Sequence, residues 1–97
     1  MKNNFIIADS GATKCQWTIV QQNKKKTITT IGISPYFLNN DEIVQIIQKA
    51  FDKKVDYKAI KDVYFYGTGL TNPSNVLILK KALKTLFTKA YLDIQTD

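Results

Sequence analysis

The sequence predicts an α/β fold in which a five-stranded mixed sheet carries two helices. The first observation behind this prediction is that three strand-like segments follow one another near the start of the chain, separated by short polar links. The second is that two segments with helical periodicity then alternate with two further strand-like segments. Hairpins connect antiparallel strands and helical crossovers connect parallel ones. The predicted order is therefore strand, strand, strand, helix, strand, helix, strand.

The first two strands are predicted to form a hairpin. Residues 5–8 are a continuous apolar run that ends at a turn signal, which predicts a buried central strand. Residues 15–20 alternate, with Cys15 and Trp17 on the same face, and this pattern indicates a half-buried strand. Cys15 is therefore expected to pack in the core rather than to react.

Three further strands complete the predicted sheet. After a polar turn at 21–25, the β-branched residues 26–31 predict a third strand near the sheet edge. Residues 63–66 predict the fourth strand and residues 91–95 the fifth. The loop that follows the third strand is expected to be ordered and to expose two aromatic side chains.

Two helices are predicted from capping residues and apolar stripes. Asn39 is a suitable N-cap, with Glu42 three residues later as a capping box requires, and the helix should end near Lys53-Lys54. Asn72-Pro73 suits the start of the second helix, because proline is favoured at the first helical position. The apolar stripes comprise Ile43, Ile46, Ile47, Ala50 and Phe51, then Val76, Leu79, Leu83, Leu86 and Phe87.

The composition narrows the possible functions. A chain of 97 residues leaves room for one domain, which excludes an active site between two full domains of this chain. All 14 basic residues are lysine and 8 residues are acidic, so the net charge of +6 favours an anionic partner. The absence of histidine excludes a Ser-His-Asp triad and a His-ligated metal, and the single cysteine excludes an internal disulfide.

We expect a cytoplasmic protein without a membrane segment. No apolar run approaches the roughly 18–20 residues of a membrane span, and the opening apolar run is too short for a signal peptide. The lysine runs at 24–26, 53–54 and 80–81 are expected on solvated turns and helix faces rather than in a binding patch.

The turn at residues 9–14 is the strongest local signal for chemistry. Gly11 lets backbone N–H groups approach an anion without a Cβ in the way, while Thr13 offers a hydroxyl and Lys14 a cation. Asp9, at the end of the first strand, can hold a hydrated Mg²⁺. An ordinary hairpin whose Asp and Gly serve only the turn is an equally good interpretation. The motif is neither a Walker A loop nor a dinucleotide fingerprint, because both of those open a helix.

Four motifs in order resemble a known family. They are DSGATK at 9–14, GISPYFL at 32–38, VYFYGTG at 63–69 and YLDIQTD at 91–97. Together they resemble the N-terminal part of the N-acetylglucosamine kinase and BadF/BadG-type ATPase family, in the actin, Hsp70 and hexokinase superfamily. The resemblance implies a ribonuclease-H-like (actin-like ATPase) half-domain, with the first three strands antiparallel and the last two parallel to the first. Residues 1–97 would be its N-terminal subdomain, a fragment ending at the fifth strand.

The resemblance also implies the site residues, with ATP and Mg²⁺ as cofactors. Asp9 would bind Mg²⁺ through water, and Asp97 would accept the proton of the attacking sugar hydroxyl. Ser34 stands where related kinases commonly carry Asn. The ATP phosphates would contact Ser10, Gly11, Ala12, Thr13 and Lys14, and the sugar would contact Gly32, Ser34 and Pro35.

Three functions follow as hypotheses. The first is an ATP-dependent kinase of N-acetylglucosamine or a related amino sugar. The intact protein would be active, with a homodimer as one expected form, and this chain alone would be inactive. The second is a BadF-type ATPase activator of a partner enzyme, whose iron–sulfur cluster would need cysteines beyond this chain. The third is a stand-alone basic module that binds nucleic acid; the lack of arginine and the scatter of the lysines argue against it.

Overall fold

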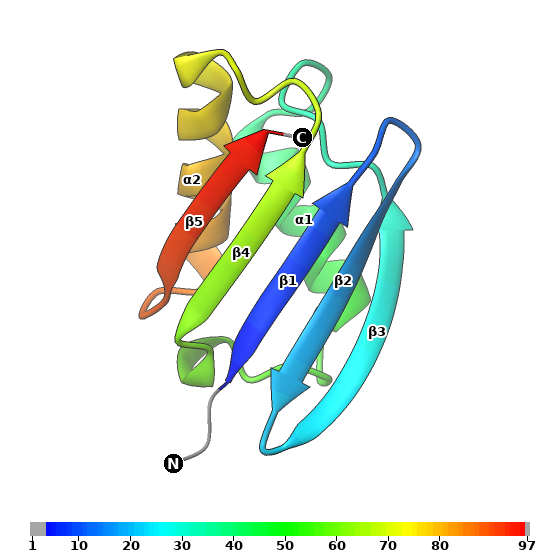
Figure 1. The fold of residues 1–97 in the computed structure, drawn as a ribbon, viewed down its shortest axis with the longest axis vertical. Helices are drawn as coiled ribbons and strands as arrows, with labels where there is room; N and C mark the ends of the chain where they lie inside the picture. Colours follow the sequence, from blue (N-terminus) through cyan, green and yellow to red (C-terminus); the bar gives the residue numbers. More distant parts are fainter. Residues whose placement is uncertain (1–3, 97) are drawn as a thin grey trace.

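A computed structural model describes residues 4–96, which form a five-stranded mixed sheet with two helices on one of its faces (Figure 1). This arrangement confirms the predicted fold class and the predicted order of elements. The elements are β1 (Phe5–Ser10), β2 (Lys14–Gln21), β3 (Lys24–Ile31), α1 (Asn40–Phe51), a 3₁₀ helix η1 (Tyr57–Ala59), β4 (Asp62–Gly67), α2 (Pro73–Leu86) and β5 (Tyr91–Thr96).

The strands lie side by side in the order β3-β2-β1-β4-β5, so β1 is central and β3 is an edge strand, as predicted. β2 pairs antiparallel with both β1 and β3, while β4 pairs parallel with both β1 and β5. The two parallel connections are made by α1 and α2, because a crossover is needed to return the chain to the same end of the sheet. The carboxyl ends of the parallel strands β1, β4 and β5 therefore lie at the same end of the sheet.

Only one face of the sheet is covered by the helices (Figure 1). In β1, Ile6 and Ala8 are fully buried against them, whereas Ile7 is 40% exposed and Asp9 is also exposed. The predicted central position of this strand is confirmed, and its burial is limited to the face that the helices cover. We call the side that carries Ile7 and Asp9 the open face.

Trp17 organises the core between the sheet and the helices. Its indole ring packs edge-on against the rings of Phe51 in α1, 5.1 Å away, and Phe65 in β4, 5.8 Å away. Its Nε1 donates a hydrogen bond of 3.0 Å to Oγ1 of Thr30 in β3. One side chain thus connects three strands and a helix, and Cys15 beside it on β2 is fully buried, as expected.

The turn between β2 and β3 is shorter than the sequence suggested. Gln22 and Asn23 both have positive φ, 53° and 65°, which is the backbone of a tight two-residue hairpin turn. Lys24 and Lys25 were expected in the turn but instead begin β3, paired with Gln21 and Val20. The prediction missed this because lysine has a low strand propensity and side-chain pattern alone does not reveal backbone pairing.

The residues that cap the two helices are those predicted from the sequence, but α1 ends earlier than predicted. Asn39 and Glu42 form the complete capping box, and Asn72 caps α2 with Pro73 at its start. α1 ends at Phe51, two residues before Lys53-Lys54, and η1 was not predicted. The buried residues of α2 are Asn75, Leu79, Ala82, Leu83 and Leu86, with Phe87 buried after its end and Val76 only half-buried. Within residues 4–96, no helix is long and apolar enough to cross a membrane.

Candidate functional site

The predicted phosphate turn forms a concave surface at the end of the β1–β2 hairpin. Its backbone is closed by a hydrogen bond of 2.9 Å from the Gly11 N–H to the Lys14 carbonyl. A depression of about 290 Å³ opens beside it on the open face of the sheet. The depression is lined by Asp9, Gly11, Thr13, Lys14 and Gln16. Four residues chosen from the sequence therefore lie together around one hollow.

Asp9 is the acidic residue of this depression. It is exposed on the open face, and in the sheet register it lies between Gln16 of β2 and Tyr66 of β4. Within residues 4–96, no three side chains of the His, Cys, Asp and Glu types gather to hold a metal by themselves. A single exposed carboxylate fits Mg²⁺, which keeps several waters and is commonly held by one or two carboxylates plus phosphate oxygens.

Gly11 has no structural need to be glycine. Its φ lies outside the left-handed region, and an added Cβ would meet its nearest atom, the Lys14 carbonyl oxygen, at 3.7 Å, an ordinary contact. Neither the backbone conformation nor the packing therefore requires a residue without a side chain at this position. What the glycine does provide is free access to the backbone from the depression.

Ser10 and Ala12 have different surroundings from the rest of the turn. Ser10 is fully buried on the helix side, where its hydroxyl accepts a 2.8 Å hydrogen bond from the Ile33 N–H and donates to the Ile33 carbonyl at 3.3 Å. Ala12 is exposed at the turn but does not line the depression. The side chain of Ser10 therefore supports the site from behind, and only its main chain adjoins the turn.

The loop after β3, predicted to contact sugar, packs directly on the phosphate turn. The Gly32 N–H donates a 3.0 Å hydrogen bond to the Thr13 carbonyl, and a Cβ on Gly32 would lie 2.5 Å from the Gly11 carbonyl oxygen. The Ser34 carbonyl accepts hydrogen bonds from the N–H groups of Phe37 and Leu38, both 3.0 Å, which closes the loop into a turn. The two loops thus form one unit.

The aromatic residues of this loop are exposed, as expected. Tyr36 is 59% exposed and Phe37 is 86% exposed, while Pro35 before them is buried. The Tyr36 ring lies against Gly69 in the loop after β4, where an added Cβ would come within 2.5 Å of it. The loops that follow β3 and β4 are therefore in contact beside the phosphate turn.

Sequence reasoning missed Gln16 and could not place Asp97. Gln16 lines the depression because side chains alternate along a strand, which puts it on the same face as its partner Asp9. That alternation was visible in the sequence. Asp97, the predicted catalytic base, lies outside the described residues.

Cys15 is next to the site but is chemically silent. Burial in the core raises the pKa of its thiol from 9.0 to about 12; the charge of Asp9 acts in the same direction, and hydrogen bonds to Ser10 and Thr30 act against it. At neutral pH the thiol is protonated, and protonated thiols are neither nucleophiles nor good metal ligands.

The fold resembles solved structures of actin-like ATPase type. A protein from Porphyromonas gingivalis, provisionally named as an N-acetylglucosamine kinase, superposes with a TM-score of 0.77 and 30% sequence identity over 96% of this chain and 34% of its own. YeaZ from Pseudomonas aeruginosa superposes with a TM-score of 0.59 and 14% identity over 98% of this chain and 44% of its own, which is evidence for the fold alone.

The chain spans about a third of the first of these proteins and less than half of the second. No protein-family model matches the sequence, and no curated protein matches it. The structural likeness confirms the resemblance inferred from the four motifs. This chain has the fold of an actin-like ATPase half-domain and is similar to part of a protein named as an N-acetylglucosamine kinase.

Proposed function

We propose that residues 1–97 are the N-terminal, phosphate-binding part of an ATP-dependent sugar kinase. The kinase would transfer the γ-phosphate of ATP to a hydroxyl of N-acetylglucosamine or a related amino sugar, in the cytoplasm. The observation that carries this proposal is the depression lined by Asp9, Gly11, Thr13 and Lys14 on the open face. The name of the Porphyromonas gingivalis protein supports the choice of substrate class.

In this proposal the turn binds the ATP phosphates. The Gly11 N–H already donates to the Lys14 carbonyl, so the N–H groups that follow it in the turn would donate to phosphate oxygens, and so would the hydroxyl of Thr13. The ammonium group of Lys14 adds a charge-assisted hydrogen bond. Ser10 and Ala12 contribute main-chain groups only, since the Ser10 hydroxyl is already bonded to Ile33.

Asp9 would hold Mg²⁺ through coordinated water at the edge of the depression. A magnesium ion held there would supply positive charge to offset the charge of the phosphate oxygens. Asp9 suits this task because it is exposed and carries its charge into the hollow rather than into the core.

The acceptor sugar would bind beside the turn, at Gly32, Ser34 and Pro35. The close packing of Gly32 on the Gly11 carbonyl supports this part of the proposal, because a direct transfer requires the two ligands to bind side by side. Asp97 is proposed as the base that accepts the proton of the sugar hydroxyl. Serine at 34 can donate one hydrogen bond to a sugar hydroxyl and accept others.

The test uses the purified product of the gene that encodes this chain. ADP release is followed with a panel of hexoses and amino sugars, and N-acetylglucosamine should stimulate it most. Replacing Lys14 with Gln should raise the KM for ATP roughly tenfold, because a charge-assisted hydrogen bond to phosphate is lost. Lys80→Gln, the same change on the exposed side of α2, should leave KM unchanged. ADP release that no sugar alters would contradict the proposal.

Neither alternative function gains support from the described residues. A BadF-type activator needs cysteines at a surface, and Cys15 is fully buried. A nucleic-acid module needs a continuous basic face, whereas the lysines lie on β2, β3, α1, α2 and the connecting segments.

A further inference from the structure

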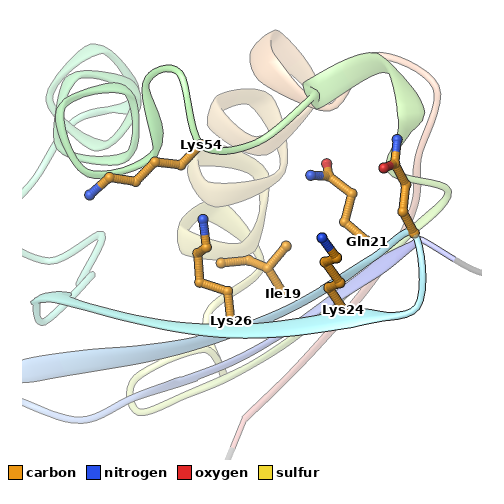
Figure 2. Close-up of a pocket in the computed structure, with 6 residues that line it drawn as sticks. Ile19, Gln21, Lys24, Lys26 and Lys54 are labelled. Carbon is orange, nitrogen blue, oxygen red and sulfur yellow. The ribbon is translucent and has the colours of Figure 1, made fainter.

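Three lysines surround a small pocket at the end of the sheet away from the phosphate turn (Figure 2). The pocket has a volume of about 120 Å³. Its lining consists of Ile19, Gln21, Gln22, Lys24, Lys26 and Lys54. β2 is eight residues long, so its two ends lie roughly 23 Å apart at about 3.3 Å per residue. The pocket is therefore distinct from the proposed ATP site.

The strand pairing explains why Lys24 and Lys26 point to the same side of β3. Lys24 and Lys26 are two residues apart in β3, so both point to the helix-covered face, where Lys26 pairs with the buried Ile19. Figure 2 shows their amino groups directed from β3 toward the segment after α1 that carries Lys54. Had Lys24 lain in a solvated turn, as the sequence suggested, its direction would not have been fixed.

Among residues 4–96, no acidic side chain lines the pocket to neutralise the lysines. The nearest carboxylates along the chain, Asp52 and Asp56, line a neighbouring depression of about 460 Å³ instead. The Gln21 Oε1 accepts a 3.0 Å hydrogen bond from the Asp56 N–H, which leaves the amide N–H₂ end of Gln21 for a ligand. The pocket thus offers donors and positive charge.

We propose that this pocket binds a small phosphate-bearing anion such as pyrophosphate. Lysine ammonium groups bind phosphate oxygens through charge-assisted hydrogen bonds, and an anion would offset the positive charge of the three lysines that line the pocket. The small volume of the pocket, about 120 Å³, suits a compact anion. The site lies on the opposite face of the sheet from Asp9, so the two sites can be filled independently.

The test is a titration of the isotopically labelled chain with sodium pyrophosphate, followed by amide chemical shifts. The amides of Gln21 to Lys26 and of Lys54 should shift together with one dissociation constant. The double variant Lys26→Gln/Lys54→Gln should weaken this constant about tenfold or more. The control Lys80→Gln/Lys81→Gln makes the same charge change on exposed positions of α2 and should leave it within twofold. If the double variant unfolds, the single variant Lys54→Gln replaces it in the titration, because Lys54 lies outside the sheet.

Several outcomes separate this site from others. Amide chemical-shift changes at Gly11 to Lys14 on addition of pyrophosphate would report binding at the proposed ATP site. The variant Lys14→Gln should abolish these changes and leave those of the lysine pocket unaltered. Sedimentation of the chain with phosphoinositide vesicles, lost in the double variant, would assign the phosphate to a lipid headgroup at the same site. The proposal is overturned if pyrophosphate and vesicles both fail to bind, if the control variant weakens binding equally, or if only single-stranded DNA shifts these amides.

Discussion

The hydroxyl of Ser10 joins the end of β1 to the loop after β3 by two hydrogen bonds to Ile33, at 2.8 Å from its N–H and 3.3 Å to its carbonyl. Two loops separated by more than 20 residues are thus held together from the buried side. The Gly32 N–H adds a third hydrogen bond between them, to the Thr13 carbonyl at 3.0 Å. The proposed donor and acceptor loops are therefore fixed relative to each other by the fold.

Removing the Ser10 hydroxyl should destabilise the protein. In Ser10→Ala the N–H and carbonyl of Ile33 stay buried without this partner, which should lower the free energy of unfolding by about 1–3 kcal/mol. Denaturant unfolding followed by the fluorescence of Trp17 measures the change. Ser74→Ala, at an exposed position of α2, should change it by less than about 0.5 kcal/mol. Equal losses in both variants would rule out the bridging role of Ser10.

Replacement by alanine should destabilise the protein at Gly32 but have little effect at Gly11. In Gly32→Ala the new Cβ would lie 2.5 Å from the Gly11 carbonyl oxygen and 2.8 Å from that of Ala12, so the phosphate turn must move. We expect a loss of about 1–3 kcal/mol of unfolding free energy, as for other overpacked sites. In Gly11→Ala the new Cβ would lie 3.7 Å from the Lys14 carbonyl oxygen, which is an ordinary contact. The free energy of unfolding of this variant should therefore stay within about 1 kcal/mol of the parent value. Thermal melts of both variants decide the comparison.

The capping box of α1 should contribute measurably to stability. The Asn39 side chain accepts a 2.9 Å hydrogen bond from the Glu42 N–H, and the Glu42 carboxylate accepts one of 3.0 Å from the Asn39 N–H. Asn39→Ala should therefore cost about 1 kcal/mol in urea unfolding. Asn40→Ala, one residue into the helix, should be close to neutral. If the Asn40 variant lost as much stability, the cap would not be the source of the effect.

Much of the fold could be predicted because local patterns agreed with it. The capping residues Asn39 and Asn72 mark both helix starts, and the alternation around Trp17 marks the buried face of β2. The failures occurred where pairing rather than pattern decides. Lys24 and Lys25 extend β3 because the tight Gln22-Asn23 turn brings them opposite β2.

The candidate site was predictable in its residues but not in its construction. The Asp9-to-Lys14 motif identified the lining of the depression. The sequence did not show that Ser10 points away from it, because Ser10 was expected in the turn, whereas it is the last residue of β1. Nor could it show that Gly32 contacts Gly11, since that contact depends on β3 and β1 each pairing with β2.

The buried thiol of Cys15 should make the protein sensitive to alkaline pH. Its pKa is raised from 9.0 to about 12, chiefly by burial, so the folded state keeps the proton after the unfolded state has lost it. The stability this contributes is fully present below about pH 9 and is lost as the pH rises from 9 toward 12, at roughly 1.4 kcal/mol per pH unit. Tyr57, whose pKa is also raised by burial and by Asp52, adds loss of the same sign.

The variant Cys15→Ala separates these two contributions. Its unfolding free energy should start lower, because a buried side chain is truncated, but should fall less steeply between about pH 8 and pH 10. Tyr57 is present in both proteins, so the difference between the two slopes isolates the thiol. Urea unfolding across this pH range measures it. Equal slopes would mean that the Cys15 thiol ionises in the folded chain as readily as in the unfolded one, and that β2 does not bury it beneath the helices.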